Sequence, residues 1–150
     1  KDADLFIEMT LLSPFNEDIS GWNTSNAVTM EGLLAGCTNF TGNLSSWDMS
    51  RVTTLKAMFH SNKALDVDVG AWDVSLVSDF SFCFYQCSSF TGEGLELWGT
   101  NSATDMTGMF QGTALVVDLS AWQVGHIKSF RSFCQGCSNG EGGDLSKWDV

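Results

Sequence analysis

The chain has 150 residues, of which 43% are hydrophobic and 12% aromatic, which is enough to build a continuous core. Its formal net charge at pH 7 is −11, from 18 acidic and 7 basic side chains. This charge repels polyanions and excludes DNA, RNA and anionic membrane surfaces as favourable partners. A membrane-spanning helix needs about 18 consecutive apolar residues. No apolar run approaches that length, so we expect no span in this segment.

Tryptophan recurs along the chain at nearly constant intervals of 25, 25, 26, 24 and 26 residues. A tandem period of this length is typical of proteins built as a stack of similar coils. We therefore predict that residues 1–150 form a single solenoid segment of about six repeats, and that this segment is a fragment of a longer protein. The tryptophans that mark the repeats are Trp22, Trp47, Trp72, Trp98, Trp122 and Trp148.

Within each repeat an aliphatic residue lies three positions before the tryptophan, and apolar residues follow two, five and eight positions after it. In residues 44–52 this alternation predicts a short strand with one buried face, which pairs with the same strand in neighbouring copies. The next segment, as in residues 55–59 and 106–110, has apolar residues at i, i+3 and i+4 and predicts one or two helical turns. The predicted fold is an α/β repeat solenoid. It is a leucine-rich-repeat-like right-handed coil, with one short strand and a short helix or helical turn per repeat of ~25 residues.

Residues 15–30 (FNEDISGWNTSNAVTM) and 72–80 (WDVSLVSDF) resemble the repeat of BspA-like surface proteins and Mycoplasma lipoproteins. Many microalgal and protist proteins carry the same repeat, whose pattern is close to F-N-x-D-I-S-x-W-D-V-S-x-V-x-x-M. The resemblance implies a leucine-rich-repeat-like solenoid in a surface or adhesive setting, and it carries over no catalytic residues. The sequence departs from the pattern in the fourth repeat, at residues 93–100, and at Cys134, where phenylalanine is usual.

The tryptophan row has two interpretations. It could be an exposed aromatic strip for sugars or flat ligands, or a buried core stack in which each indole N–H needs an internal acceptor. We favour the core stack, because each tryptophan falls in the buried slot of the predicted strand.

A row of mostly acidic residues lies four positions before the tryptophans. Stacked about 4.8 Å apart, as neighbouring strands are, such carboxylates could hold calcium. Asp and Asn also cap turns by bonding to their own backbone, and we favour this role because a glycine interrupts the row and no EF-hand motif is present. No other cofactor is expected. The row is Asp18, Asn43, Asp68, Gly94, Asp118 and Asp144.

The five cysteines are interpreted mainly as small buried thiols that pack behind the sheet. Cys37 and Cys87 share one repeat slot, where Asn62 and Thr113 stand in other copies, so we expect both to be unpaired and free of metal. A local disulfide between Cys134 and Cys137 is the alternative for that pair. Because the number of cysteines is odd, at least one thiol is free or pairs outside this chain.

No catalytic motif is present, so we expect a protein that is not an enzyme. The first hypothesis is a binding or adhesion module of a surface or secreted protein, which contacts a protein or glycan and is located outside the cell or on its surface. The second is a structural scaffold or linker in a larger, possibly organelle-associated assembly from a microalga or protist. The residues one and three positions after each tryptophan would form the concave binding face. The candidates are Asn23, Ser25, Asp48, Ser50, Asp73, Ser75, Asn101 and Gln123, together with Gly99 and Gly125.

Overall fold

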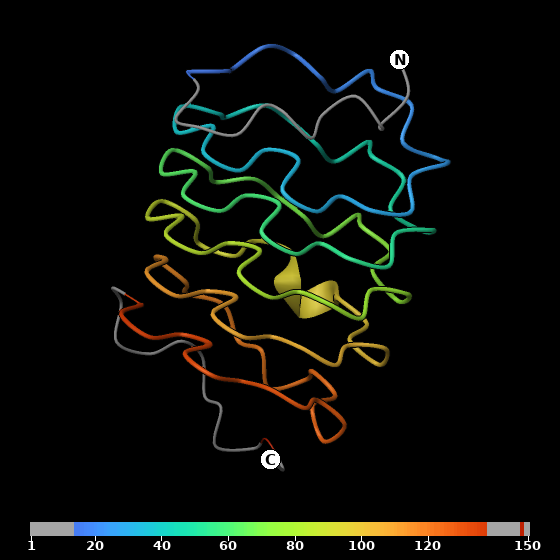
Figure 1. Cartoon of the computed structure of the whole chain (residues 1–150), viewed down its shortest axis with the longest axis vertical. Coiled ribbons are helices and arrows are strands. Elements are labelled where there is room, and N and C mark those ends of the chain that lie inside the picture. The colour runs from blue at the N-terminus through green and yellow to red at the C-terminus, as the bar shows by residue number, and fades with distance from the viewer. Residues whose placement is uncertain (1–13, 138–147, 149–150) are drawn as a thin grey trace.

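The repeats lie one on another in sequence order, as irregular flattened coils (Figure 1). The structure is a computed structural model, and it describes residues 14–137 and 148. In that part of the chain the regular elements are one 3-10 helix, η2 (Leu95–Leu97), and single-residue parallel bridges between neighbouring copies. The bridges join residues seven positions after each tryptophan, in the order Thr29, Thr54, Asp79, Asp105 and Ser129.

The predicted α/β solenoid, with a strand and a short helix in every repeat, is therefore wrong. The half of the repeat around the tryptophan consists of consecutive turns rather than a strand. In the second copy the Trp47 N–H bonds to the Leu44 carbonyl at 3.1 Å, and the Val52 N–H bonds to the Met49 carbonyl at 2.9 Å. Turns replace the strand because Asp and Asn side chains at their starts bond to the backbone two residues further on. The alternation of buried and exposed side chains survives, since Asp48 is exposed between buried Trp47 and Met49.

The segment predicted to be helical forms what we call the turn ribbon. Alternate N–H groups close turns within the ribbon, as from Met58 to the Leu55 carbonyl at 3.1 Å. The other N–H groups bond to the next copy, as from Phe59 to the Cys83 carbonyl at 2.9 Å. Backbone pairing between copies thus runs mainly through the predicted helix and not through the predicted strand. The turn ribbons are residues 30–37, 55–62, 80–87, 106–113 and 130–137.

Each turn ribbon contains two residues with positive φ, at the positions 10 and 14 residues after the tryptophan. A right-handed helix needs negative φ throughout, so these residues interrupt it twice within eight positions. Glycine occupies half of these places, because it enters the left-handed region without steric cost. The pairs are Gly32 and Gly36, Ala57 and Ser61, Phe82 and Gln86, Gly108 and Gly112, and Ser132 and Gly136.

Hydrogen bonds between the turn ribbons continue from copy to copy through single peptide groups. The Gly32 N–H donates to the Lys56 carbonyl at 2.9 Å, and the N–H of the same peptide group, on Ala57, donates to the Ser81 carbonyl at 2.9 Å. The N–H of the next peptide group in this series, on Phe82, donates to the Thr107 carbonyl at 2.8 Å. The ribbons therefore satisfy their backbone groups along the stack, as an α-helix does along its axis.

The core is a stack of indole and phenyl rings that runs through the coils. Trp47, Trp72, Trp98 and Trp122 are buried, whereas Trp22 and Trp148 are half-buried. The ring centres of neighbouring tryptophans lie 6.1–6.5 Å apart where the rings stack, farther than the strand spacing of about 4.8 Å expected from the sequence. Offset stacking explains the larger separation. Each indole N–H from Trp47 onward bonds to the aliphatic residue three positions before the preceding tryptophan, as from Trp72 to the Leu44 carbonyl at 3.0 Å.

Candidate functional site

The residues proposed for a concave binding face are on the surface, but their side-chain oxygens serve local turns. Asp48 Oδ1 accepts hydrogen bonds from the N–H and hydroxyl of Ser50, at 3.0 and 2.6 Å. Asn23 caps Ser25 in the same way, and Asp73 Oδ1 accepts the Ser75 N–H at 3.0 Å. Hydrogen bonds from the serine lower the pKa of Asp48 and of Asp73, and the bond from the serine side chain has a larger effect than the bond from its backbone. The later members, Asn101 and Gln123, are exposed, and the whole row offers no large side chain as an anchor.

The acidic row four positions before the tryptophans also caps turns. The side-chain oxygen of the row residue accepts the N–H two positions on, at 3.0 Å for Asp18, 2.9 Å for Asn43 and 2.8 Å for Asp68. Asp118 makes the same bond to Ser120, and Asp144 lies outside the described residues. Within residues 14–137, no group of three or more His, Cys, Asp or Glu side chains is arranged to hold a metal ion.

The cysteines divide into two kinds. Cys37, Cys83 and Cys87 are buried free thiols, and burial raises the pKa of Cys87 to about 12. Cys134 and Cys137 instead form a disulfide, so the interpretation of these two as unpaired thiols is wrong. A turn closed by the Cys137 N–H and the Cys134 carbonyl holds their Cα atoms 5.4 Å apart, within the range that a disulfide needs.

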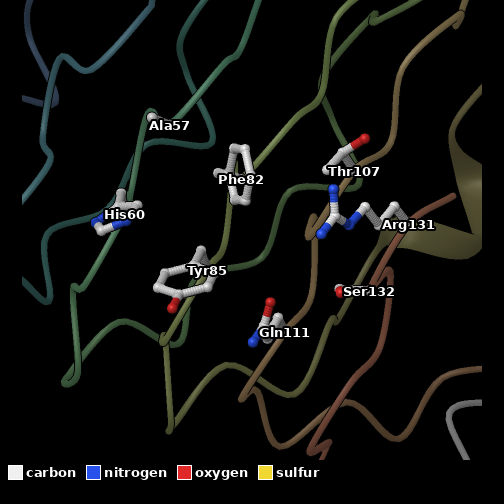
Figure 2. A pocket seen from close by; sticks show the side chains of 8 residues that line it. All are labelled: Ala57, His60, Phe82, Tyr85, Thr107, Gln111, Arg131 and Ser132. Atoms are coloured by element: carbon white, nitrogen blue, oxygen red, sulfur yellow. The ribbon is translucent and has the colours of Figure 1, made fainter. Parts of the chain in front are cut away.

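A groove that the sequence analysis missed crosses the outer surface of four successive turn ribbons. It has a volume of about 460 Å³ and is lined by two residues from each ribbon (Figure 2). Volumes of this order are typical of small-molecule sites. The lining residues are Ala57, His60, Phe82, Tyr85, Thr107, Gln111, Arg131 and Ser132.

Three aromatic rings form one side of the groove. The Tyr85 ring stacks on the His60 ring with centres 4.7 Å apart, and it forms a T-shaped pair with the Phe82 ring, with centres 5.8 Å apart. Burial lowers the pKa of His60 below its usual value near 6.5, so its imidazole is neutral at pH 7. All three rings are only partly buried, and they present apolar surface to solvent.

Phe82 adopts the left-handed backbone conformation, with φ of 57°. This conformation costs a bulky residue roughly 1–2 kcal/mol. The Phe82 ring lies over Gly108 in the next copy, where an added Cβ would come within 2.7 Å of two ring carbons. The equivalent position in the other ribbons holds glycine, alanine or serine, so the fold itself does not need a phenylalanine there.

The opposite side of the groove is polar and carries one positive charge. Arg131 is exposed, and its side chain points across the groove toward Phe82 (Figure 2). Gln111, Thr107 and Ser132 add amide and hydroxyl groups, and none of the described residues that line the groove is acidic. Within residues 14–137, the one ion pair is between Lys56 and Glu31, at 3.2 Å, which leaves the Arg131 guanidinium without a carboxylate partner in that part of the chain.

A sequence family described as "Mycoplasma protein of unknown function, DUF285" matches residues 3–116 and 84–150. The chain belongs to this family. The match confirms the Mycoplasma part of the resemblance seen in the sequence. The described repeats do not each contain a strand and a helix, which contradicts a leucine-rich-repeat fold. No curated protein and no solved structure matches the chain. Among the residues that the structure describes, no helix is long and apolar enough to cross a bilayer.

The groove of this DUF285 protein depends on residues that differ between repeats. Phe82 and Tyr85 lie 10 and 13 positions after their tryptophan, where the first copy has Gly32 and Ala35. The sequence signal that could have predicted the groove was therefore a pair of bulky residues at repeat positions where another copy has small residues.

Proposed function

We propose that this chain is a non-enzymatic recognition module of a surface or secreted protein, and that its groove binds a sugar residue of a glycan. The observation that carries the proposal is Phe82, which holds a strained backbone conformation while its ring lies at the surface beside Tyr85. Strain that the fold does not require is concentrated at functional sites.

The chemistry of the groove suits a sugar. The C–H face of a pyranose ring is apolar, and packing it on Phe82 or Tyr85 removes apolar surface of both partners from water. Around these rings, Thr107, Gln111 and Ser132 offer donors and acceptors for sugar hydroxyls.

The proposed location is the outside of the cell or its surface, as the resemblance to BspA-like proteins implies. The alternative of a structural scaffold is supported by a different observation, the hydrogen bonds that continue through peptide groups such as that of Lys56 and Ala57. Such bonding makes a stack of copies a stiff spacer. The two roles are compatible, because the groove is lined by side chains from four successive turn ribbons and therefore runs along the stack (Figure 2).

The test is a glycan-binding screen followed by calorimetry on the best ligand, with the variant Phe82→Gly. Glycine relieves the left-handed strain but removes the ring, so the free energy of unfolding should change by less than about 1 kcal/mol, since the two effects oppose each other. Affinity should fall at least about tenfold, or 1.4 kcal/mol.

The matched control is Gln86→Gly. Gln86 also has positive φ (59°) and lies against a glycine of the next copy, Gly112, but it does not line the groove. This variant should keep full affinity. If no glycan binds, or if both variants bind as the parent does, the proposed function is wrong.

A further inference from the structure

We propose that the sugar bound in the groove carries a carboxylate, as sialic and uronic acids do, and that Arg131 holds this carboxylate. This inference rests on the proposed function and names the ligand class. The starting observation is the charge of the groove. The chain has 18 acidic and 7 basic side chains, yet the described residues that line the groove include one arginine and no acid.

Arg131 is placed to bind an anion next to the aromatic rings. Its backbone carbonyl accepts the Gly108 N–H at 2.8 Å, and the Phe82 ring covers the same glycine. The ring and the arginine therefore belong to the two copies on either side of Gly108, and both lie next to this one point of the stack. In Figure 2 the guanidinium faces Phe82 across the groove. A sugar whose apolar face packs on Phe82 can direct a ring substituent to the guanidinium.

The guanidinium is well suited to a carboxylate. It presents N–H donors in a planar fork that matches the two oxygens of a carboxylate, and such charge-assisted pairs are about twice as strong as neutral hydrogen bonds. Within residues 14–137 no carboxylate pairs with Arg131, so binding a ligand there does not require breaking an ion pair in that part of the chain. The neutral groups of Gln111 and Ser132 remain for hydroxyl groups.

The charge outside the groove limits the ligand to a few negative groups. The net charge of −11 repels anions, but at physiological salt this repulsion is screened over about 8 Å. The acids closest in sequence to the lining residues of these copies are Asp79 and Asp105, which cap turns through bonds from Ser81 and Thr107 at 2.8 Å. A single carboxylate can bind at Arg131, whereas a heavily sulfated polymer would extend over acidic surface. The ligand is thus an acidic sugar residue and not a polyanion.

The experiment compares four probes by calorimetry: a sialic-acid-terminated oligosaccharide, a glucuronate-terminated one, and the carboxyl-reduced form of each. The parent protein should bind at least one acidic probe about tenfold more tightly than its reduced form, or 1.4 kcal/mol. Arg131→Gln should remove this difference while retaining the binding of the reduced form. The matched control is Arg51→Gln, which removes an equal charge at an exposed arginine bonded to Asn26 outside the groove. It should leave the difference unchanged.

The outcomes separate this inference from the proposed function. Equal binding of acidic and reduced probes that is lost in Phe82→Gly would overturn the carboxylate while leaving glycan binding intact. If Arg51→Gln and Arg131→Gln lose the preference for the acidic probe equally, the preference comes from long-range attraction to positive charge. That result would overturn the role of Arg131 in holding the carboxylate. Tighter binding of a sulfated polysaccharide, or of an acidic peptide, than of the acidic sugar would also overturn the inference. Failure of every sugar to bind would overturn both proposals.

Discussion

Replacing Trp72 by alanine should remove a large part of the protein's stability. Trp72 is 4% exposed, and its ring stacks on Trp98 at 6.3 Å and on Phe59 at 6.2 Å. Truncation of a buried tryptophan costs about 3–5 kcal/mol, from lost packing and the cavity that remains. The loss also leaves the Leu44 carbonyl without its bond to the indole N–H, 3.0 Å long. A net cost of about 4 kcal/mol is a large share of the free energy of unfolding, which is usually about 5–15 kcal/mol for a native protein.

The assay is chemical denaturation followed by the fluorescence of the remaining tryptophans. Trp72→Phe separates the contributions, because it keeps an aromatic ring in the stack and removes only the indole donor and part of the volume. It should cost about 1–2 kcal/mol. The surface control is Leu76→Ala, at a side chain that is 53% exposed, and it should change stability by less than about 0.5 kcal/mol. A cost below about 1 kcal/mol for Trp72→Ala would refute the burial and the energetics inferred here.

Three further predictions concern the turn ribbons. Gly108→Ala should lower the free energy of unfolding by about 2 kcal/mol and weaken ligand binding, because φ is positive and the new Cβ would press on the Phe82 ring. The control Gly32→Ala has a similar φ but open space around the new Cβ, so it should cost only about 1 kcal/mol in thermal or chemical unfolding. Asn62→Thr should raise the unfolding free energy by about 1 kcal/mol, since the buried amide of Asn62 has no partner whereas threonine in the same slot, Thr113, bonds to its own ribbon at 2.9 Å. The three free thiols should resist a thiol reagent until denaturant is added and then react in full without a reductant; fast labelling of the native protein would contradict their burial.

The period and the apolar rows of the sequence identified which residues are buried, but not the backbone that buries them. Residues such as Met30, Leu33 and Leu34 have the i, i+3, i+4 spacing of a helix, and the turn ribbon buries the same positions. The signal against a helix was the presence of both Gly32 and Gly36 in a segment predicted to form one or two helical turns, since glycine is unfavourable there. In the ribbon of residues 55–62 that signal is missing, because Ala57 and Ser61 adopt the same left-handed conformation. Hydrogen bonds between copies hold these two residues in the left-handed conformation, and the sequence of a single repeat does not reveal such bonds.

The candidate site escaped prediction for a related reason. The rows that recur in every copy were the predicted sites of function, but they serve the core, as Trp72 does, or the turns, as Asp48 does. The groove is made instead by departures from the repeat, chiefly Phe82, Tyr85 and Arg131. That these three residues line one groove depends on the coil-to-coil register, which no local pattern specifies.

The bonds between turn ribbons also give the row of ribbons an electric polarity. In the peptide group shared by Lys56 and Ala57, the carbonyl points to the preceding copy and the N–H to the following one. Each such group is a dipole of about 3.5 D, and dipoles aligned head to tail add along an axis, as they do in a helix. The partial positive charge of the turn ribbons therefore gathers toward the C-terminal copies, and bonds that run the opposite way outside the ribbons, as from Thr53 to Val28 and from Ala64 to Thr38, offset part of it. Each added copy in the same register extends this macrodipole, so the number of repeats sets the separation of its poles. Arg131, in the last ribbon that the structure describes, lies toward the pole that attracts anions.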